Sequence, residues 1–446
     1  RARAALAVLV VGLGTLGGCY APSAVVHAEL SIAANGAHTL NGQAIAPEAL
    51  ASTLQGLVDR FNLHGERLGD VVAGAVMKHS RDFNLVRESV LSTTLARETP
   101  AFDIQQACGT GLEAAMLVAN KIALGHIECG IAGGVDTTSD APVGLNEKLR
   151  KILLEASRAK TTVQRLSALA KVRPAMLVQP ALPRNGEPRT GLSMGEHAEQ
   201  MAAEWDISRE DQDELALKSH QNLARAYEDG FFNDLMTPFK GVARDNNLRA
   251  DLTIEKLRSL KPCFDKKVRP EQGTLTPGNS TPLTDGASAV LLASEEWAAA
   301  RNLPVQAYIT FSEVAAVDFF DKKEGLLMAP AYAVPRMLAR AGLTLQDFDY
   351  YEIHEAFAAQ VLCTLNAWQD KVFCKNQLGL SKPLGKIDMS KLNVNGSSLA
   401  AGHPFAATGG RIVATLAKML AQKGSGRGLI SICAAGGQGV VAIIER

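Results

Sequence analysis

AFDIQQACGTGLEAAMLVANKIALGHIECGIAGGVD, residues 101–136, contains the clearest fold signal of this chain. Phe102–Gln105 and Glu128–Gly133 are short apolar runs that predict strands. Between them, the apolar side chains of Leu112–Leu124 recur at helical spacing, which predicts an amphipathic helix. A strand, a helix and a second strand in this order indicate a β-α-β unit. We therefore expect a parallel sheet covered by helices.

The same rhythm fills residues 50–145 and resumes in the C-terminal part of the chain. The intervening residues 146–272 are different: Leu149–Val172 is basic and amphipathic, a proline-dotted stretch follows, and then helical segments. We expect an N-terminal α/β half over residues 1–145 that is completed by about 273–303, an inserted helical loop domain over 146–272, and a second α/β half over 304–446. A weak internal repeat relates the halves, so corresponding strand ends should meet where ligands bind in such sheets.

Composition restricts the classes of function. Lysine plus arginine and aspartate plus glutamate are equal at 46 each, so no global field attracts nucleic acid. The seven cysteines are scattered and contain no C-x-x-C pair, which argues against a disulfide framework or a zinc site and favours a reducing compartment. No run of 18 apolar residues predicts a membrane-spanning helix.

The N-terminus has two interpretations. Residues 1–19 resemble a secretory or lipoprotein signal, with a basic start and an apolar stretch before Leu16-Gly17-Gly18-Cys19. The alternative, which we favour, is a buried first strand at Ala7–Val11. The G-x-G-x-x-G of Gly12–Gly17 is a weak dinucleotide signal, because Pro22 leaves little room for the crossover helix that such a fingerprint opens.

Four polar groups at the ends of predicted strands carry the chemistry: Cys108, His354, His403 and Cys433. Each lies beside alanine- or glycine-rich sequence. Cys108 opens the Leu112–Leu124 helix, where the dipole is expected to lower the thiol pKa. A thiol nucleophile needs a base, and chemistry at carbon needs a second proton carrier. The four groups therefore predict one composite site for carbon–sulfur acyl chemistry.

Each of these groups also has a structural interpretation. Cys108 would be a small buried residue in a helix cap, and Cys433 a cysteine of a strand core. His354 would be a helix-start histidine held by Glu355, and His403 a loop histidine. Gly109 and Gly111 are expected to let backbone approach a bound acyl group.

In order along the chain, QACGTG (106–111), HEAF (354–357), GHPFAATG (402–409) and CAAGGQG (433–439) resemble the four signature segments of the thiolases. The resemblance covers about residues 50–446. His354 stands where asparagine is commoner, and together with the basic segment Leu149–Val172 it resembles the 3-ketoacyl-CoA thiolase branch of fatty-acid β-oxidation, including the trifunctional-enzyme β-subunit. The resemblance implies a layered αβαβα architecture of two duplicated α/β halves.

The resemblance also implies a mechanism. Cys108 attacks the 3-keto carbon of a 3-ketoacyl-CoA, and Cys433 protonates the departing acetyl-CoA carbanion or enolate. Coenzyme A then takes the acyl group, with His403 as the activating base. One oxyanion hole would consist of His403 and a water held by His354, and the other of the backbone N–H groups of Cys108 and Ala435.

Coenzyme A and acyl-CoA are implied as substrates, with no permanently bound cofactor and no metal. Residues matched to coenzyme A contacts are Met194, Arg249, Ser280 and Thr281. The implied partners are CoA thioesters, further copies of the chain in a homodimer or homotetramer, and a hydratase/dehydrogenase of β-oxidation. The basic run Leu149–Val172 could touch a membrane or is a solvated helix face. The expected location is the cytoplasm, or the mitochondrial matrix in a eukaryote.

Other functions remain open at this point. An acetoacetyl-CoA thiolase working in the condensation direction would use the same residues. A β-ketoacyl synthase would pair one cysteine with two histidines, and Cys433 argues against it. A non-catalytic acyl-CoA-binding protein would not need all four polar groups. A nicotinamide-dependent oxidoreductase built on the N-terminal glycines would bind NAD(H).

Overall fold

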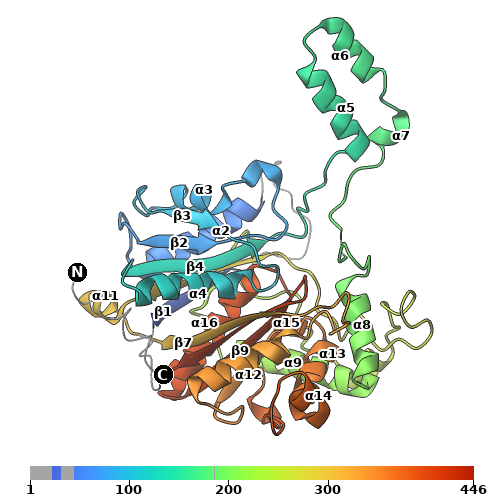
Figure 1. Cartoon of the computed structure of the whole chain (residues 1–446). Coiled ribbons are helices and arrows are strands. Elements are labelled where there is room, and N and C mark those ends of the chain that lie inside the picture. The colour runs from blue at the N-terminus through green and yellow to red at the C-terminus, as the bar shows by residue number, and fades with distance from the viewer. Residues whose placement is uncertain (1–22, 32–44, 185) are drawn as a thin grey trace.

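The structure is a computed structural model that describes residues 23–31, 45–184 and 186–446 (Figure 1). The candidate signal at residues 1–19, the expected strand Ala7–Val11 and the Gly12–Gly17 motif lie outside the described residues. The first described strand is β1 (Ser23–Ser31), which the sequence patterns did not predict. It pairs with strands from both halves of the chain, so it joins the two parts of the sheet structure.

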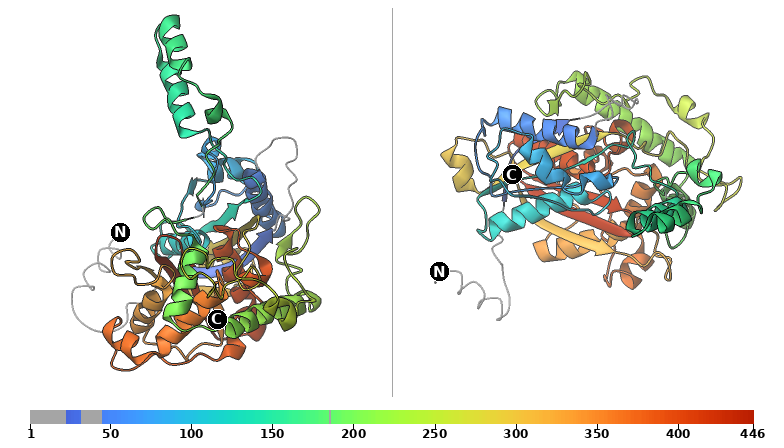
Figure 2. Two further views of the ribbon diagram at one scale, coloured as in Figure 1. Left: turned by 90° about the vertical axis from the view of Figure 1, so that its right-hand side faces the viewer. Right: turned by 90° about the horizontal axis from the view of Figure 1, so that it is seen from above.

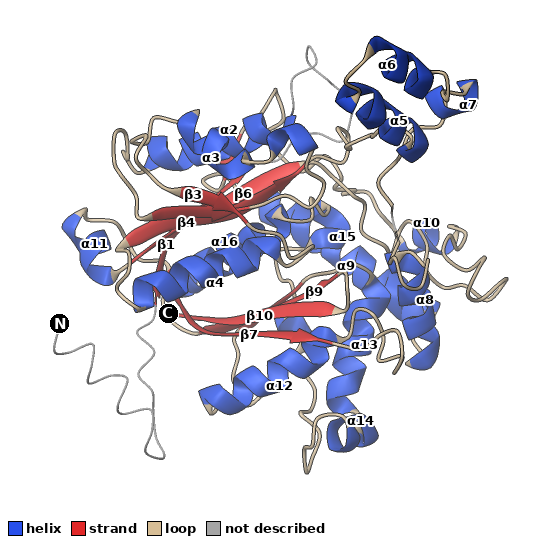
Figure 3. Cartoon of the chain, turned by 45° about the horizontal axis from the view of Figure 1, so that its top comes forward, coloured by secondary structure: helices blue, strands red, loops and turns tan. Residues whose placement is uncertain are grey.

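The chain forms five layers, helices alternating with sheet (Figure 3). One outer layer contains α2 (Ile45–Arg60) and α3 (Leu85–Leu91). α4 (Thr110–Ala123) and α16 (Ala407–Lys423) lie between the two sheet layers, and α12 (Ala329–Ala341) and α13 (Ala358–Gln369) cover the far side. The expected αβαβα architecture is confirmed.

The hydrogen-bonded strand order is β3-β2-β4-β6-β1-β7-β10-β9-β8, with the short β5 beside β1. The strands other than β1 are β2 (Asp70–Ala73), β3 (Ala101–Asp103), β4 (Cys129–Asp136), β5 (Met236–Thr237), β6 (Gly286–Ala293), β7 (Ala307–Ala316), β8 (Tyr350–Ile353), β9 (Arg427–Ala434) and β10 (Gln438–Glu445). Every residue of β4 and β6 is buried, as expected of strands covered by helices on both faces.

The expected parallel pairing is confirmed for the strands of residues 50–145, from whose β-α-β pattern it was drawn, whereas most of the other strand pairs are antiparallel. β2 runs parallel to β3 and β4, and β8 runs parallel to β9. The pairs β4–β6, β1–β6, β1–β7, β7–β10 and β9–β10 are antiparallel. The physical reason is clearest at β9 and β10, which a tight turn connects, because a short hairpin can only join antiparallel strands.

Residues 146–272 divide into two parts. The first is a helical hairpin of α5 (Glu147–Arg158), α6 (Thr162–Leu169) and the short α7 (Pro174–Leu177), which projects from the body on two extended segments (Figures 1 and 2). The second contains α8 (Met194–Glu204) and α9 (Arg209–Glu228), which pack against the body beside α13. Only this second part lies next to the catalytic segments.

The remaining short elements are η2 (Ser80–Asp82), α10 (Ile254–Arg258), α11 (Glu295–Ala300), α14 (Lys371–Asn376), η3 (Met389–Lys391) and α15 (Ser398–Ala401). Among the described residues, no helix is both long enough and apolar enough to cross a membrane.

Candidate active site

Cys108 lies in a strained turn between β3 and α4. The preceding residue, Ala107, has a positive φ of 46°, which is costly for a residue with a Cβ atom. The Thr110 hydroxyl holds this turn: it accepts a hydrogen bond from the Gln106 N–H at 2.8 Å and donates one to the Ala107 carbonyl at 2.7 Å. The nucleophile candidate is therefore placed by its own motif, two residues before the helix begins.

The motif glycines are required by close packing of the helix start. A Cβ atom on Gly111 would lie 2.5 Å from the Ala406 carbonyl oxygen, and one on Gly109 would lie 2.6 Å from the Val440 side chain. Glycine at these positions lets the start of α4 approach the start of α16 and strand β10. This close approach brings Cys108 next to the histidine loop that precedes α16.

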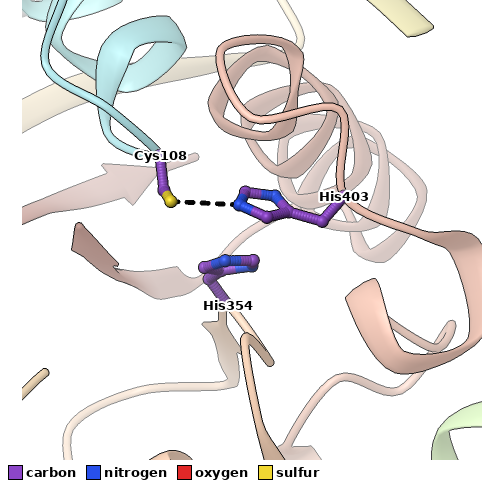
Figure 4. A group of neighbouring side chains, drawn as sticks. All are labelled: Cys108, His354 and His403. Carbon is purple, nitrogen blue, oxygen red and sulfur yellow. Dashed lines mark hydrogen bonds between the residues drawn. The ribbon is translucent and has the colours of Figure 1, made fainter. Parts of the chain in front are cut away.

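His403 reaches Cys108 from that loop (Figure 4). Its Nε2 atom is 3.0 Å from Cys108 Sγ, and its Nδ1 atom is 2.6 Å from the hydroxyl of Thr408. Gly402, with φ of 98°, lets the chain turn before the histidine. The hydroxyl on Nδ1 fixes the ring, so Nε2 is aimed at the thiol as the geometry of a general base requires.

The resting site holds a neutral thiol and a neutral imidazole. Burial raises the pKa of Cys108 to about 12, although backbone hydrogen bonds from Ala435 and from Cys108 itself oppose this shift. Burial, reinforced by the charge of Arg411, lowers the pKa of His403 to about 3. The expected lowering of the Cys108 pKa by the helix dipole was wrong, because desolvation of the thiolate outweighs it. The proton must therefore move during attack.

His354 is completely buried at the end of β8, and its ring centroid lies 4.2 Å from that of His403. Glu355 does not hold it. Its carboxylate instead accepts hydrogen bonds from the Ser219 hydroxyl, the Asn393 amide and the Leu399 N–H. Glu355 thereby ties α9 and the segment before α15 to the end of β8. The alternative in which Glu355 pins His354 was wrong.

Cys433 is the second-last residue of β9, and the turn after this strand completes the site. The thiol is 1% exposed, and burial raises its pKa well above the ordinary value, with a smaller contribution from Cys108. In the turn, Gly436 and Gly437 have φ of 79° and 71°, which glycine adopts without strain. The turn directs the Ala435 backbone toward Cys108, and the Gly436 N–H donates to Glu187 at 2.7 Å.

The residues matched to coenzyme A contacts lie on segments around this centre. Thr281 donates its hydroxyl to the Ser398 carbonyl at 2.6 Å, and Ser280 is buried beside it. Met194 begins α8 and is partly buried, whereas Arg249 is exposed and donates to carbonyls of its own loop. Both of these bonds use Nη1, so the Nε and Nη2 donors of this exposed guanidinium remain available to a ligand.

The ligand-type atoms of Cys108, His354 and His403 all lie within 4.8 Å of one another. By residue type this cluster suits a divalent cation such as Zn²⁺. However, the charge of Arg411 lowers the pKa of both histidines and would equally repel a bound cation. We therefore interpret the cluster as an acyl-transfer centre.

Two family models match the chain. The thiolase N-terminal domain matches residues 23–296, and the thiolase C-terminal domain matches residues 303–446. The 3-ketoacyl-CoA thiolase of Yersinia pestis (strain Pestoides F) is 40% identical over 395 residues, which are 87% of this chain and 89% of the relative. The chain belongs to the thiolase family. It is accordingly an acyltransferase, and the resemblance of its four motifs to the thiolases is confirmed.

Solved thiolases share the fold. The acetyl-CoA acetyltransferase of Bacillus anthracis has a TM-score of 0.77 at 29% identity, covering 96% of this chain and 100% of that one. Human mitochondrial 3-ketoacyl-CoA thiolase in complex with CoA has a TM-score of 0.77 at 28% identity, covering 96% and 98%. A further structure of the human enzyme gives 0.76 at 28% identity, with coverage of 96% and 99%.

Sequence reasoning missed several residues that support this thiolase site, namely Asp136, Asn393, Ser398, Thr408 and Arg411. Asp136 accepts N–H groups from Val76, Met77 and Ala406, and so ties the loop before α16 to the end of β2. Arg411 could have been noticed as a charged residue within the small-residue and apolar first half of α16. Asn393 and Ser398 carried no local signal, because their partners are distant in the sequence.

Proposed function

We propose that this thiolase cleaves 3-ketoacyl-CoA with coenzyme A to give acetyl-CoA and a shortened acyl-CoA. The observation that carries the proposal is the 3.0 Å contact between Cys108 Sγ and His403 Nε2, with the second thiol Cys433 on the neighbouring strand end. The names of the similar relatives support the substrate class.

In the first half-reaction, Cys108 gives its proton to His403 Nε2 while its sulfur attacks the 3-keto carbon. Collapse of the resulting oxyanion breaks the bond between C2 and C3, and the electron pair remains on C2 of acetyl-CoA as an enolate. The Cys433 thiol protonates this carbon. Because burial keeps Cys433 protonated, it is available as an acid at neutral pH.

In the second half-reaction, the imidazolium returns its proton to the Cys433 thiolate, and His403 again becomes a base. It then takes the proton of the coenzyme A thiol, whose sulfur attacks the acyl-Cys108 thioester. Cys108 leaves as a thiolate and recovers a proton from His403. The backbone N–H groups of Cys108 and Ala435 would stabilise one oxyanion, and the two histidines the other.

The decisive experiment is incubation with 3-ketoacyl-CoA of short and long chain, followed by intact-mass measurement and peptide mapping. We expect an acyl adduct on Cys108 that coenzyme A removes, and its absence in Cys108→Ala. An adduct confined to another cysteine, or cleavage that persists in Cys108→Ala, would contradict the mechanism. Rates for acetoacetyl-CoA and 3-ketopalmitoyl-CoA distinguish an acetoacetyl-CoA thiolase from an enzyme of β-oxidation.

We also propose that the projecting hairpin of α5–α7 contacts an anionic membrane surface. Both of its glutamates are paired internally, Glu147 with Arg150 and Glu155 with Lys171. Other basic side chains of the hairpin are Lys148, Lys151, Arg158, Lys160, Arg165 and Arg173. Val163 and Leu166 on α6 are 78% and 62% exposed, which combines apolar and basic surface on one projection (Figure 2).

Co-sedimentation tests this contact. We expect binding to phosphatidylglycerol vesicles and much less to phosphatidylcholine, with loss in the double variant Val163→Glu/Leu166→Glu. Phe83→Glu is the matched control, because Phe83 is 80% exposed on the body of the molecule and should not matter. Equal sedimentation of all variants with vesicles, or no sedimentation of the wild-type protein with either lipid, would refute the membrane contact. Retention by a hydratase/dehydrogenase instead would assign the hairpin to a protein partner.

A further inference from the structure

The two ring nitrogens of His354 have very different surroundings. Nδ1 lies 2.8 Å from the hydroxyl oxygen of Ser398, at the start of α15. Nε2 is buried and has no hydrogen-bond partner among the described residues. The ring of His354 lies beside Cys108 and His403, and one ring nitrogen of each histidine and Cys108 Sγ are within 4.8 Å of one another (Figure 4). Which nitrogen carries the proton therefore determines whether His354 offers the site a donor or an acceptor.

Arg411 determines how Ser398 can interact with the ring. Its Nη2 atom donates to Ser398 Oγ at 2.7 Å. A guanidinium can only donate, so this bond uses an acceptor lone pair of the hydroxyl and leaves its hydrogen free. Among the described residues, His354 Nδ1 is the acceptor within reach of that hydrogen. A hydroxyl that donates to Nδ1 requires Nδ1 to be unprotonated, and in a neutral ring the proton is then on Nε2.

Ser398 itself is held from both sides. Its carbonyl accepts the Thr281 hydroxyl at 2.6 Å, and the N–H of the next residue, Leu399, donates to Glu355 at 3.1 Å. The serine is also fully buried. Its hydroxyl thus has a fixed position between a permanent cation and the imidazole. Burial, together with the charge of Arg411, lowers the pKa of His354 well below its usual value, which keeps the ring neutral.

We propose that Arg411 and Ser398 are positioning residues that hold His354 in the tautomer with its proton on Nε2. His354 then presents a neutral N–H donor to the substrate oxygen that becomes negative beside Cys108, directly or through one water. Holding the donor in place before reaction avoids reorganisation when the charge forms. This inference rests on the proposed function for its catalytic consequence, but not for the tautomer itself.

The tautomer can be measured on the unliganded wild-type protein by ¹⁵N NMR with labelled histidine, using His354→Asn to assign the resonances. We expect the pattern of an imidazole protonated on Nε2. A resonance pattern with the proton on Nδ1 would overturn the proposal. Because this measurement needs no turnover, its outcome is independent of whether the chain is active with 3-ketoacyl-CoA.

The kinetic test is Ser398→Ala, with Ser397→Ala as the matched control. Ser397 is the neighbouring buried serine, and its side-chain oxygen makes no hydrogen bond among the described residues. We expect Ser398→Ala to lower kcat by about 10- to 100-fold with little change in KM, since losing an oxyanion donor costs about 10²–10³-fold. Ser398→Thr, which keeps the hydroxyl, should restore most of kcat. A kcat for Ser398→Ala within about 3-fold of wild type would refute the catalytic role.

A double-mutant cycle separates positioning from a general structural effect. If Ser398 acts through the His354 ring, Ser398→Ala should have little further effect on kcat in a His354→Asn background, because an amide donor has no tautomer to fix. Equal losses of kcat in both backgrounds would contradict the proposal. Arg411→Lys provides the second route if Ser398→Ala does not fold. This variant keeps a cationic donor and should retain the Nε2–H resonance of His354. Loss of that resonance in a folded Arg411→Lys protein would also contradict the proposal.

Discussion

Gly111→Ala tests whether the contact between the starts of α4 and α16 sets the catalytic geometry. The added Cβ atom would lie 2.5 Å from the Ala406 carbonyl oxygen and 2.9 Å from the Gly410 nitrogen. Non-bonded atoms prefer separations of about 3.5 Å, so the two helix starts must move apart by roughly 1 Å. Both contacts are backbone, which cannot rotate away as a side chain can.

Two energies compete in this variant. Alanine is favoured over glycine within a helix by about 1 kcal/mol. Overpacking of a close contact costs about 1–3 kcal/mol. We therefore expect a net loss of stability of about 1 kcal/mol and, more importantly, a displaced Cys108. A misplacement of about 1 Å in a catalytic constellation can cost roughly 10²-fold in rate.

The assay is kcat/KM for thiolytic cleavage of acetoacetyl-CoA, measured beside a thermal unfolding curve. Gly144→Ala is the control, since its Cβ would meet only Ala181 atoms at 3.7 Å, an ordinary contact. We expect wild-type behaviour from Gly144→Ala and a loss of about 10²-fold from Gly111→Ala. A Gly111→Ala protein with wild-type kcat/KM and a raised melting temperature would refute the reasoning.

Three further outcomes are expected. Cys433→Ala should still be acylated on Cys108 by an acyl-CoA, as detected by mass measurement. Its rate of 3-ketoacyl-CoA cleavage should fall by about 10²–10⁴-fold, because the enolate loses the acid that protonates it. A fall in acylation as well would contradict this role of Cys433. Asn393→Ala should lower the free energy of unfolding by about 2–3 kcal/mol, because Glu355 Oε1 and the backbone N–H and carbonyl of Ile353 are buried and lose their Asn393 partner. An unchanged denaturation midpoint would argue against it. The pKa of His403, lowered to about 3, predicts that kcat/KM has no acid inflection near about pH 6.5. Because His403 binds a proton more readily in the unfolded chain, the free energy of unfolding should fall as the pH drops below about 6.5.

The four catalytic segments could be read from the sequence because each is a local pattern. Strand β4 and helix α4 lie where the apolar run and the helical spacing predicted them, within a few residues at each end. The parallel direction of β2, β3 and β4 was predicted correctly, whereas the antiparallel pairs were not predicted, because they join strands that are distant in the sequence or follow a hairpin. The pKa direction of Cys108 was also wrong, because burial of the thiol is a property of everything packed around it.

The sequence alone determined the family, the two thiols and the two histidines, because a glycine-rich turn beside a reactive side chain is a short-range signature. Only the tertiary structure decided how these groups are held. His403 meets Cys108 across a sequence separation of 295 residues, because Gly111 lets α4 and α16 touch. Ser398 and Arg411 reach His354 from another segment, and hydrogen-bond direction, which no sequence pattern encodes, assigns its proton.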